Sequence, residues 1–305
     1  MTEPSNGKRQ IGGGPRLRKA MRGFAAAGAL LFFSTSGVVA APPQRVVSTF
    51  LCTDEYVFRL VPREHIAALS FEAGDRHPVV STIADRVGGI AQIHPSTETV
   101  LDFKPDLVVM YAGTNARLHA NLKALDVPIL DVPWDNSLAD IRRTTRWLGG
   151  KFGAPDKAAA MIAAMDARLA AARRAAPRPP VRTLIYEPRG YATIGAVTQE
   201  LMTLAGLVNA APAYRADRTG AVAVEDVIAT APQLLIFSGR RHVQNARADL
   251  ILHHPALAAL DGRTLSAWDP LTPLLCPGPW SADAAASFAA LGRKARLLGK
   301  RQARN

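Results

Sequence analysis

Two stretches of the chain, ETVLDFKPDLVVMY at residues 98–111 and EDVIATAPQLLIFS at residues 225–238, share one pattern. In each, a glutamate (Glu98 or Glu225) lies seven residues before a proline, and a run of apolar residues follows the proline. Because proline cannot continue a helix, each stretch predicts a short helix, a stop and then a buried strand. The repeat indicates two similar structural units in one chain.

The sequence around both stretches alternates between strand-like and helix-like segments. In the first half, the predicted strands are residues 44–50, 65–70, 107–111 and 127–134, and the predicted helices are 53–61, 115–125 and 137–149. In the second half, strands are predicted at 182–187, 233–239 and 264–268, and helices at 199–208, 223–232, 254–260 and 281–298. Residues 86–97 read as a loop whose Ser96 or Thr97 caps the next helix. This alternation is typical of parallel sheets covered by helices on both faces.

A long helix is predicted between the two series, from Pro155 to about Ala175. Its apolar stripe is Ala158, Met161, Ile162, Met165 and Leu169. We expect the chain to bend before it, at Gly149-Gly150 and Gly153, and PRPP at 177–180 to end it. The predicted fold class is therefore α/β, with two lobes built on parallel sheets and joined by a single long helix. Residues 41–137 would form the first lobe, 138–180 the helical linker and 181–305 the second lobe with a basic tail.

Composition excludes some classes of function. The 305 residues are 48% hydrophobic, which is enough for two packed domains. The formal charge of +12 is concentrated at the ends, with +5 in residues 1–40 and +6 in residues 293–305. The remaining body carries about +1 and no basic stripe, so we expect no binding of nucleic acid.

Residues 1–40 have the pattern of an export signal. The basic segment RLRKAMRG precedes the apolar stretch FAAAGALLFFSTSGVVA, which is short for a membrane span. We expect cleavage after Ala40, and an uncleaved anchor is the alternative. Export would place Cys52 and Cys276 in an oxidising compartment. The sequence leaves three states open for them: a disulfide, two packed thiols, or thiols that face a ligand.

The mature chain resembles a known family. RVVSTFLCTDEYVFRLV, ETVLDFKPDLVVMY, VEDVIATAPQLLIFSG and PGPWSADAA, between about Arg45 and Leu298, are similar to periplasmic substrate-binding proteins of ABC importers for cobalamin and ferric siderophores. The resemblance implies a monomeric periplasmic protein, without a cofactor of its own, that captures a metal chelate and delivers it to the importer. It also implies that Glu98 and Glu225, which match the family's docking positions, contact arginine pockets on the membrane subunits.

Ligands of such two-lobed proteins bind in the cleft between the lobes, at the carboxyl ends of the strands. Aromatic side chains offer a chelate a large rigid surface, and arginines can meet anionic groups. The candidates for ligand contact are Cys52, Thr53, Tyr111, Trp134, Tyr186, Arg189, Tyr191, Arg240 and Trp280. For each of them, an ordinary structural role is an equal alternative.

Other classes of function have less support. The mature chain lacks a nucleophile elbow, a phosphate loop and an H-E-x-x-H motif, so we predict that it is not an enzyme. A carrier of free zinc or manganese is the alternative function, and His77 and His94 are its candidate cleft residues. None of the seven histidines shows tight ligand spacing. Corrinoid, haem, hydroxamate, catecholate and carboxylate chelates all remain open as cargo.

Overall fold

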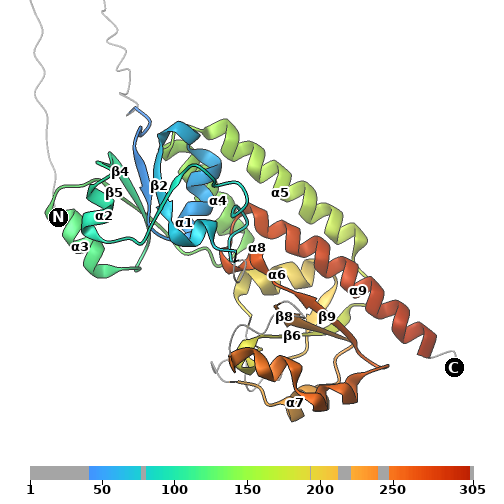
Figure 1. The fold of residues 1–305 in the computed structure, drawn as a ribbon. Coiled ribbons are helices and arrows are strands. Elements are labelled where there is room, and N and C mark those ends of the chain that lie inside the picture. Colours follow the sequence, from blue (N-terminus) through green and yellow to red (C-terminus); the bar gives the residue numbers. More distant parts are fainter. Residues whose placement is uncertain (1–40, 77–79, 193, 212–220, 240–246, 303–305) are drawn as a thin grey trace, which may run out of the picture. The chain divides into compact units, whose positions relative to one another are not determined.

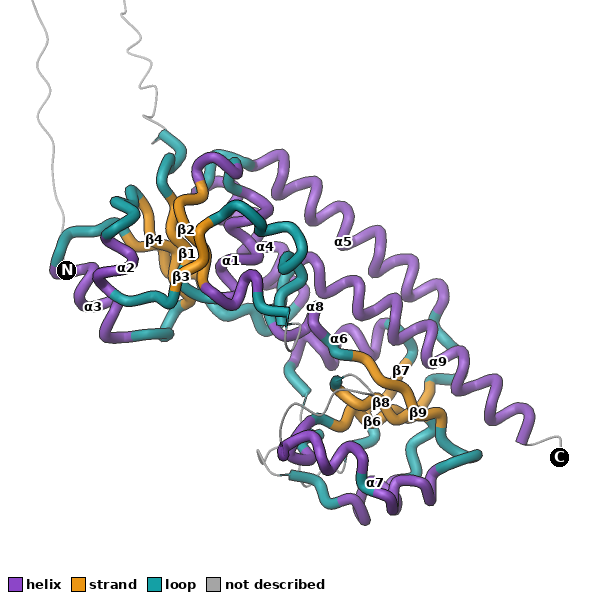
Figure 2. Tube along the Cα trace, viewed as in Figure 1, coloured by secondary structure: helices purple, strands orange, loops and turns teal. Residues whose placement is uncertain are grey.

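The computed structural model describes residues 41–76, 80–192, 194–211, 221–239 and 247–302, and the predicted export signal lies outside these ranges. The first sheet has five parallel strands in the order β3-β2-β1-β4-β5. They are β1 (Val46–Ser48), β2 (Ile66–Ser70), β3 (Ala91–Ile93), β4 (Leu107–Tyr111) and β5 (Ile129–Val132). Its helices are α1 (Leu51–Leu60), α2 (Thr97–Leu101), α3 (Ala116–Ala124) and α4 (Leu138–Lys151). Figure 2 shows strands and helices in separate colours.

Alternate residues of the first sheet face opposite cores. Val109 and Tyr111 of β4 join the core that contains α1 and α4. Val108 and Met110, between them in sequence, join the core that contains α2 and α3. Both faces are therefore covered, which is why the strand is apolar throughout.

The second sheet has four parallel strands in the order β7-β6-β8-β9. They are β6 (Val181–Tyr186), β7 (Leu207–Asn209), β8 (Leu234–Ser238) and β9 (Leu265–Asp269). Its helices are α6 (Ala196–Leu204), α7 (Val224–Thr230), α8 (Thr272–Leu275) and α9 (Ala282–Gln302). Ile185 and Ile236 pack with α6 and α9, whereas Leu184 and Leu235 pack with α7.

The long helix α5 (Pro155–Ala175) leads from the first sheet to the second, and it packs along α4 and α9 (Figure 1). Of its predicted stripe, Ala158, Met165 and Leu169 are buried and Met161 and Ile162 are half-buried. The predicted fold class, two parallel-sheet lobes joined by a long helix, is confirmed. None of the helices in the described ranges combines the length and hydropathy that a bilayer span requires.

Three local predictions were wrong. The helix predicted at 199–208 ends at Leu204, because Gly206 takes a positive φ of 75° and turns the chain into β7. The loop predicted at 86–97 contains β3, which is too short for a clear pattern. Gly149 and Gly150 lie inside α4 rather than at a bend. A Cβ on Gly149 would lie 2.4 Å from the Cβ of Ala158, so this glycine allows α4 and α5 to approach closely.

Candidate functional site

The loops that follow the strands place polar and aromatic side chains at one edge of each sheet. All strands in both sheets are parallel, so the carboxyl ends of each sheet lie along one edge. In α/β proteins this edge is where ligands bind. The candidate site is therefore built from the residues after β1, β4 and β5 in the first lobe and after β6, β8 and β9 in the second.

Three aromatic rings meet at the carboxyl edge of the first sheet. Phe50 follows β1, Tyr111 ends β4 and Trp134 follows β5. The ring centroids of Trp134 and Tyr111 are 4.2 Å apart, and those of Phe50 and Tyr111 are 5.7 Å apart. Trp134 Nε1 donates to the carbonyl oxygen of Ala112 at 2.8 Å, which holds an indole that is 53% exposed. This first-lobe aromatic cluster presents a fixed flat surface to solvent.

Tyr111 forms the base of the cluster rather than its surface. It is 1% exposed, and burial raises the pKa of its hydroxyl to about 12. The phenol therefore stays protonated at neutral pH. Its role in the structure is to pack beneath Trp134.

Asp135, directly after Trp134, is a buried acid with two partners. Its Oδ1 accepts from Thr144 Oγ1 at 2.7 Å, and its Oδ2 accepts from the Tyr56 hydroxyl at 3.4 Å. It is 6% exposed, and burial raises its pKa above the ordinary value. These partners hold the carboxyl group in one position at the carboxyl edge.

The loop after β6 forms the corresponding edge of the second sheet. It contains the short helix η3 (Pro188–Gly190), where Arg189 is exposed and takes a φ of 65°. Tyr191 is half-buried and forms a single antiparallel bridge with Ala221. Tyr186 is fully buried, its hydroxyl donates to the carbonyl oxygen of Val222 at 2.8 Å, and burial raises its pKa to about 12. Of the predicted contacts on this loop, Arg189 has the greatest access to solvent.

A cavity of about 350 Å³ is lined from both edges. Trp134, Asp135 and Asn136 contribute from the first lobe, and Glu187 and Ser238 contribute from the second. The first turn of α6 and the residues between 271 and 277 complete the lining. The volume lies within the range of small-molecule sites, about 300–1,000 Å³. Of the predicted ligand contacts, Trp134 alone belongs to this lining within the described part of the chain.

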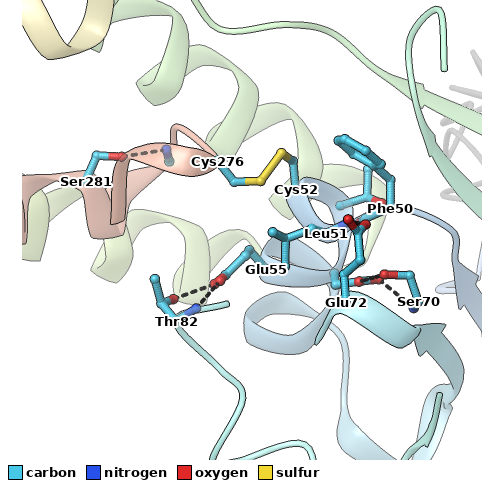
Figure 3. Close-up of a disulfide and its surroundings, with 12 residues drawn as sticks. Phe50, Leu51, Cys52, Glu55, Ser70, Glu72, Thr82, Cys276 and Ser281 are labelled. Carbon is cyan, nitrogen blue, oxygen red and sulfur yellow. Dashed lines mark hydrogen bonds between the residues drawn. A yellow bond between two sulfur atoms is a disulfide. The ribbon is translucent and has the colours of Figure 1, made fainter. Parts of the chain in front are cut away.

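Cys52 forms a disulfide with Cys276, which settles the state of the two cysteines (Figure 3). Cys52 and its neighbour Thr53 are buried, and the Thr53 hydroxyl is 2.7 Å from that of Ser48. Neither side chain therefore offers a ligand any surface. The disulfide joins α1 to the segment that precedes Pro277, a residue of the cavity lining. It therefore anchors the chain next to this part of the lining.

Trp280, in the helical turn η7 (Pro279–Ser281), packs between α1 side chains and is 6% exposed. Its ring centroid lies 4.9 Å from that of Tyr56, and the Arg59 guanidinium lies over it at 4.4 Å. Trp280 thus belongs to the core of the first lobe, although the sequence places it in the second. Arg240, the remaining predicted contact, lies outside the described residues.

Sequence reasoning missed four residues of the carboxyl edges: Phe50, Phe71, Asp135 and Glu187. Phe71 begins the short helix η2 (Phe71–Gly74) after β2, and it stacks on His94 with centroids 4.1 Å apart. All four lie within three residues of a strand's end. A search confined to the residues that follow each predicted strand would have found Phe71 and Asp135, whereas Phe50 and Glu187 lie at the last position of predicted strands.

The two repeated glutamates occupy matching places. Glu98 lies in the first turn of α2 and Glu225 in the first turn of α7, and both are exposed. The backbone N–H of Glu98 and the Ser96 hydroxyl hold the pKa of its carboxyl below the ordinary value. Glu98 is therefore ionised at neutral pH, as a contact with a basic partner requires.

Histidine positions give no support to a free-metal site. Within the described ranges, no three His, Cys, Asp or Glu side chains come together in a way that could hold a metal ion. His94 is exposed and stacked on Phe71, and His77 lies outside these ranges.

The family described as periplasmic binding protein matches residues 68–262. A comparison with curated proteins found no match. Among solved structures, the apo haem-binding protein RhuT from Roseiflexus sp. is similar at 24% identity and a TM-score of 0.64, covering 83% of this chain and 98% of that one. The vitamin B12 binding protein BtuF of Vibrio cholerae is similar at 21% identity and a TM-score of 0.61, and the match covers 84% of this chain and 98% of that one. An Fe3+-hydroxamate transport protein from Saccharomonospora viridis is similar at 19% identity and a TM-score of 0.59, and the match covers 82% of this chain and 93% of that one.

Proposed function

The chain belongs to the periplasmic binding protein family, and we propose from this that it captures a metal chelate and delivers it to an ABC importer. Membership of a family of binding proteins confirms the prediction that the chain is not an enzyme. The proposal is supported by the fold it shares with proteins for haem, vitamin B12 and Fe3+-hydroxamate. A carrier of free metal has no supporting observation in the described residues, and we do not propose it.

The observation that carries the proposal is the cavity lined from both carboxyl edges, with the exposed Trp134 indole in its wall. A flat, rigid indole suits a macrocycle or a compact chelate, because it buries a large area at little cost in conformational entropy. We propose that Trp134 contacts the cargo from the first lobe and that Tyr191 does so from the second. Arg189 is exposed and lies outside the cavity lining, which favours an ordinary structural role for it. Tyr111 and Tyr186 would support these contacts from beneath.

Glu98 and Glu225 are proposed as the docking residues. Each is an exposed acid in the first turn of a short helix, and the two helices precede equivalent strands of the two sheets. Paired carboxylate–guanidinium contacts are strong and fix orientation. One such contact per lobe would position a monomeric binding protein over the membrane subunits of the importer.

Export to the periplasm, with cleavage after Ala40, is part of the proposal. The Cys52–Cys276 disulfide supports it, since such bonds persist in oxidising compartments. Mass spectrometry of the exported protein should find Ala41 at the N-terminus. An exported chain that retains residues 1–40 would contradict this cleavage site.

The experiment that tests the function is a titration of residues 41–305, which pack as a unit of their own, with a panel of chelates. Isothermal calorimetry with corrinoids, haem and ferric siderophores should show saturable binding of one class at micromolar affinity or better. Free zinc and manganese are the comparison ligands. Binding of either ion without binding of any chelate would contradict the proposal.

Trp134→Ala tests the site itself. Loss of the indole should weaken binding of that chelate by about tenfold, in line with about 0.5–1.5 kcal/mol for an aromatic contact plus its buried area. Trp147→Ala is the matched control, because Trp147 is an exposed indole on α4 away from the cavity lining. Equal effects of the two variants would remove Trp134 from the site.

A further inference from the structure

The charged side chains in the cavity wall are all acidic within the described part of the chain. Asp135 enters from the first lobe and Glu187 from the second, and the described lining contains no arginine, lysine or histidine. The rest of the wall is largely apolar, with Ile185, Ile194 and Leu271 among its members. A ligand in this cavity therefore meets two carboxyl groups set among apolar side chains.

The two acids differ in how they are held. Asp135 is fixed by Thr144 and Tyr56, as described above. Glu187 has its backbone fixed, since its N–H donates to the Tyr191 carbonyl at 2.8 Å and its own carbonyl accepts from Gly190 at 3.0 Å. Its side chain is half-buried, and its carboxylate has no hydrogen-bond partner among the described residues. Burial raises the pKa of Glu187, as expected for an acid that lacks a compensating donor.

The first turn of α6 adds hydrogen-bond donors to the cavity wall. Its N-cap, Gly195, supplies no side-chain hydrogen bond, so the backbone N–H groups of this turn lack side-chain acceptors. Gly195 to Thr198 lie in the cavity wall. The wall thus offers acceptors on two carboxylates and donors at one helix terminus. An amide group matches both, because its N–H donates and its carbonyl accepts.

We propose that the cargo is an uncharged or cationic metal chelate that presents amide or ammonium N–H groups to Asp135 and Glu187. This inference rests on the proposed function. An anionic chelate would bring its negative charge close to these two carboxylates, which disfavours binding. A donor from the cargo would instead form charge-assisted hydrogen bonds with both acids.

Calorimetry with four probes tests the inference. Cyanocobalamin carries primary amides and ferrioxamine B carries an ammonium group, whereas haemin carries propionates and ferric enterobactin is an anionic catecholate. One of the first two should bind most tightly to residues 41–305. Tightest binding of haemin or ferric enterobactin would overturn the inference and leave the proposed function standing. Failure of all chelates to bind would overturn the proposed function itself.

Variants of Glu187 sharpen the test. Glu187→Gln should weaken binding of the preferred chelate by about tenfold, because the acceptor of the hydrogen bond loses its charge. Glu187→Lys should weaken it further and strengthen binding of haemin. Glu64→Gln is the matched control, because Glu64 is an exposed acid outside the cavity lining. Thermal melts establish that each variant is folded, and unchanged affinities in both Glu187 variants would overturn the inference.

Discussion

The two lobes share one strand order and differ in the helix that follows the first strand. Strands β2-β1-β4-β5 correspond to β7-β6-β8-β9, and in each sheet the strand of the repeated stretch pairs with the first strand. After β1, however, α1 buries Asp54 and Glu55, whereas α6 after β6 buries apolar side chains. The two lobes thus repeat one strand order, but the helix after the first strand buries acidic side chains only in the first lobe.

The buried acids of α1 are tolerated because each has partners. Asp54 accepts from the Ser70 backbone N–H at 3.1 Å and from its hydroxyl at 2.5 Å. Glu55 accepts from Thr82 (Figure 3). It also forms an ion pair with Arg59 at 2.5 Å. Hydrogen bonds offset the cost of removing a charge from water. They also tie α1 to the end of β2 and to the turn that contains Thr82.

The strongest predicted effect tests whether the two repeated glutamates, Glu98 and Glu225, have the same role in the two lobes. Glu98→Lys with Glu225→Lys should abolish uptake of the cargo in vesicles that contain the importer, since each reversal opposes a proposed basic pocket. Ligand affinity should not change. Glu64→Lys, an exposed acid in the short helix η1 (Arg63–His65), is the control and should transport normally. Normal uptake by the double variant would refute docking through these glutamates. The single variants Glu98→Lys and Glu225→Lys should each reduce uptake, and a deficit in only one of them would show that the lobes dock unequally.

The second prediction concerns the disulfide that joins α1 to the segment after β9. Cys52→Ala with Cys276→Ala should lower the free energy of unfolding by about 2–5 kcal/mol, because the bond closes a long loop in the unfolded chain. Ligand affinity should also fall, as the wall that ends at Pro277 loses its support. Urea unfolding and calorimetry measure the two effects. Reduced wild-type protein should behave like the variant, and a difference between them would point to another cause.

The third prediction tests the buried acid of α1. Burial raises the pKa of Asp54 from 3.8 to about 7. The folded state therefore binds this proton more tightly than the unfolded chain, so the contribution to stability is full at low pH and is lost as pH rises to about 7. Wild type should lose up to about 4 kcal/mol relative to Asp54→Asn between about pH 4 and 7. If the curves of unfolding free energy against pH were parallel for wild type and Asp54→Asn, the raised pKa of Asp54 would be contradicted.

The fourth and smallest effect concerns N-terminal capping, which differs between the two short helices that carry the glutamates. In α2, Ser96 accepts from the Thr99 N–H at 3.2 Å, and Thr99 Oγ1 accepts from the Ser96 N–H at 2.9 Å. In α7, the N-cap is Ala223, which has no side-chain acceptor. Ser96→Ala should therefore lower the free energy of unfolding by about 1 kcal/mol, and Ala223→Ser should raise it by about 0.5 kcal/mol. Urea unfolding would detect both changes, and equal shifts in one direction would contradict this difference in capping.

Local sequence patterns were enough to predict several elements of the fold. The apolar runs of β4 and β8, the proline that opens α5 and the Ser96 cap each depend on residues within a few positions. The repeated glutamates could be found in the same way, because the repeat is visible as a spacing. The predicted two-lobe arrangement followed from the alternation of these elements.

Contacts between residues far apart in the sequence became apparent once the chain was folded. The disulfide joins positions separated by 224 residues, and Trp280 packs in the core of the lobe opposite to the one predicted. Asp135 and Glu187 line one cavity although they follow strands of different sheets. Periodicity reports which face of an element is buried but not which partner covers it, because hydrophobic burial is non-directional. The partner is chosen by the packing of the whole chain, and so the composition of the candidate site could be recognised only once the strands were placed.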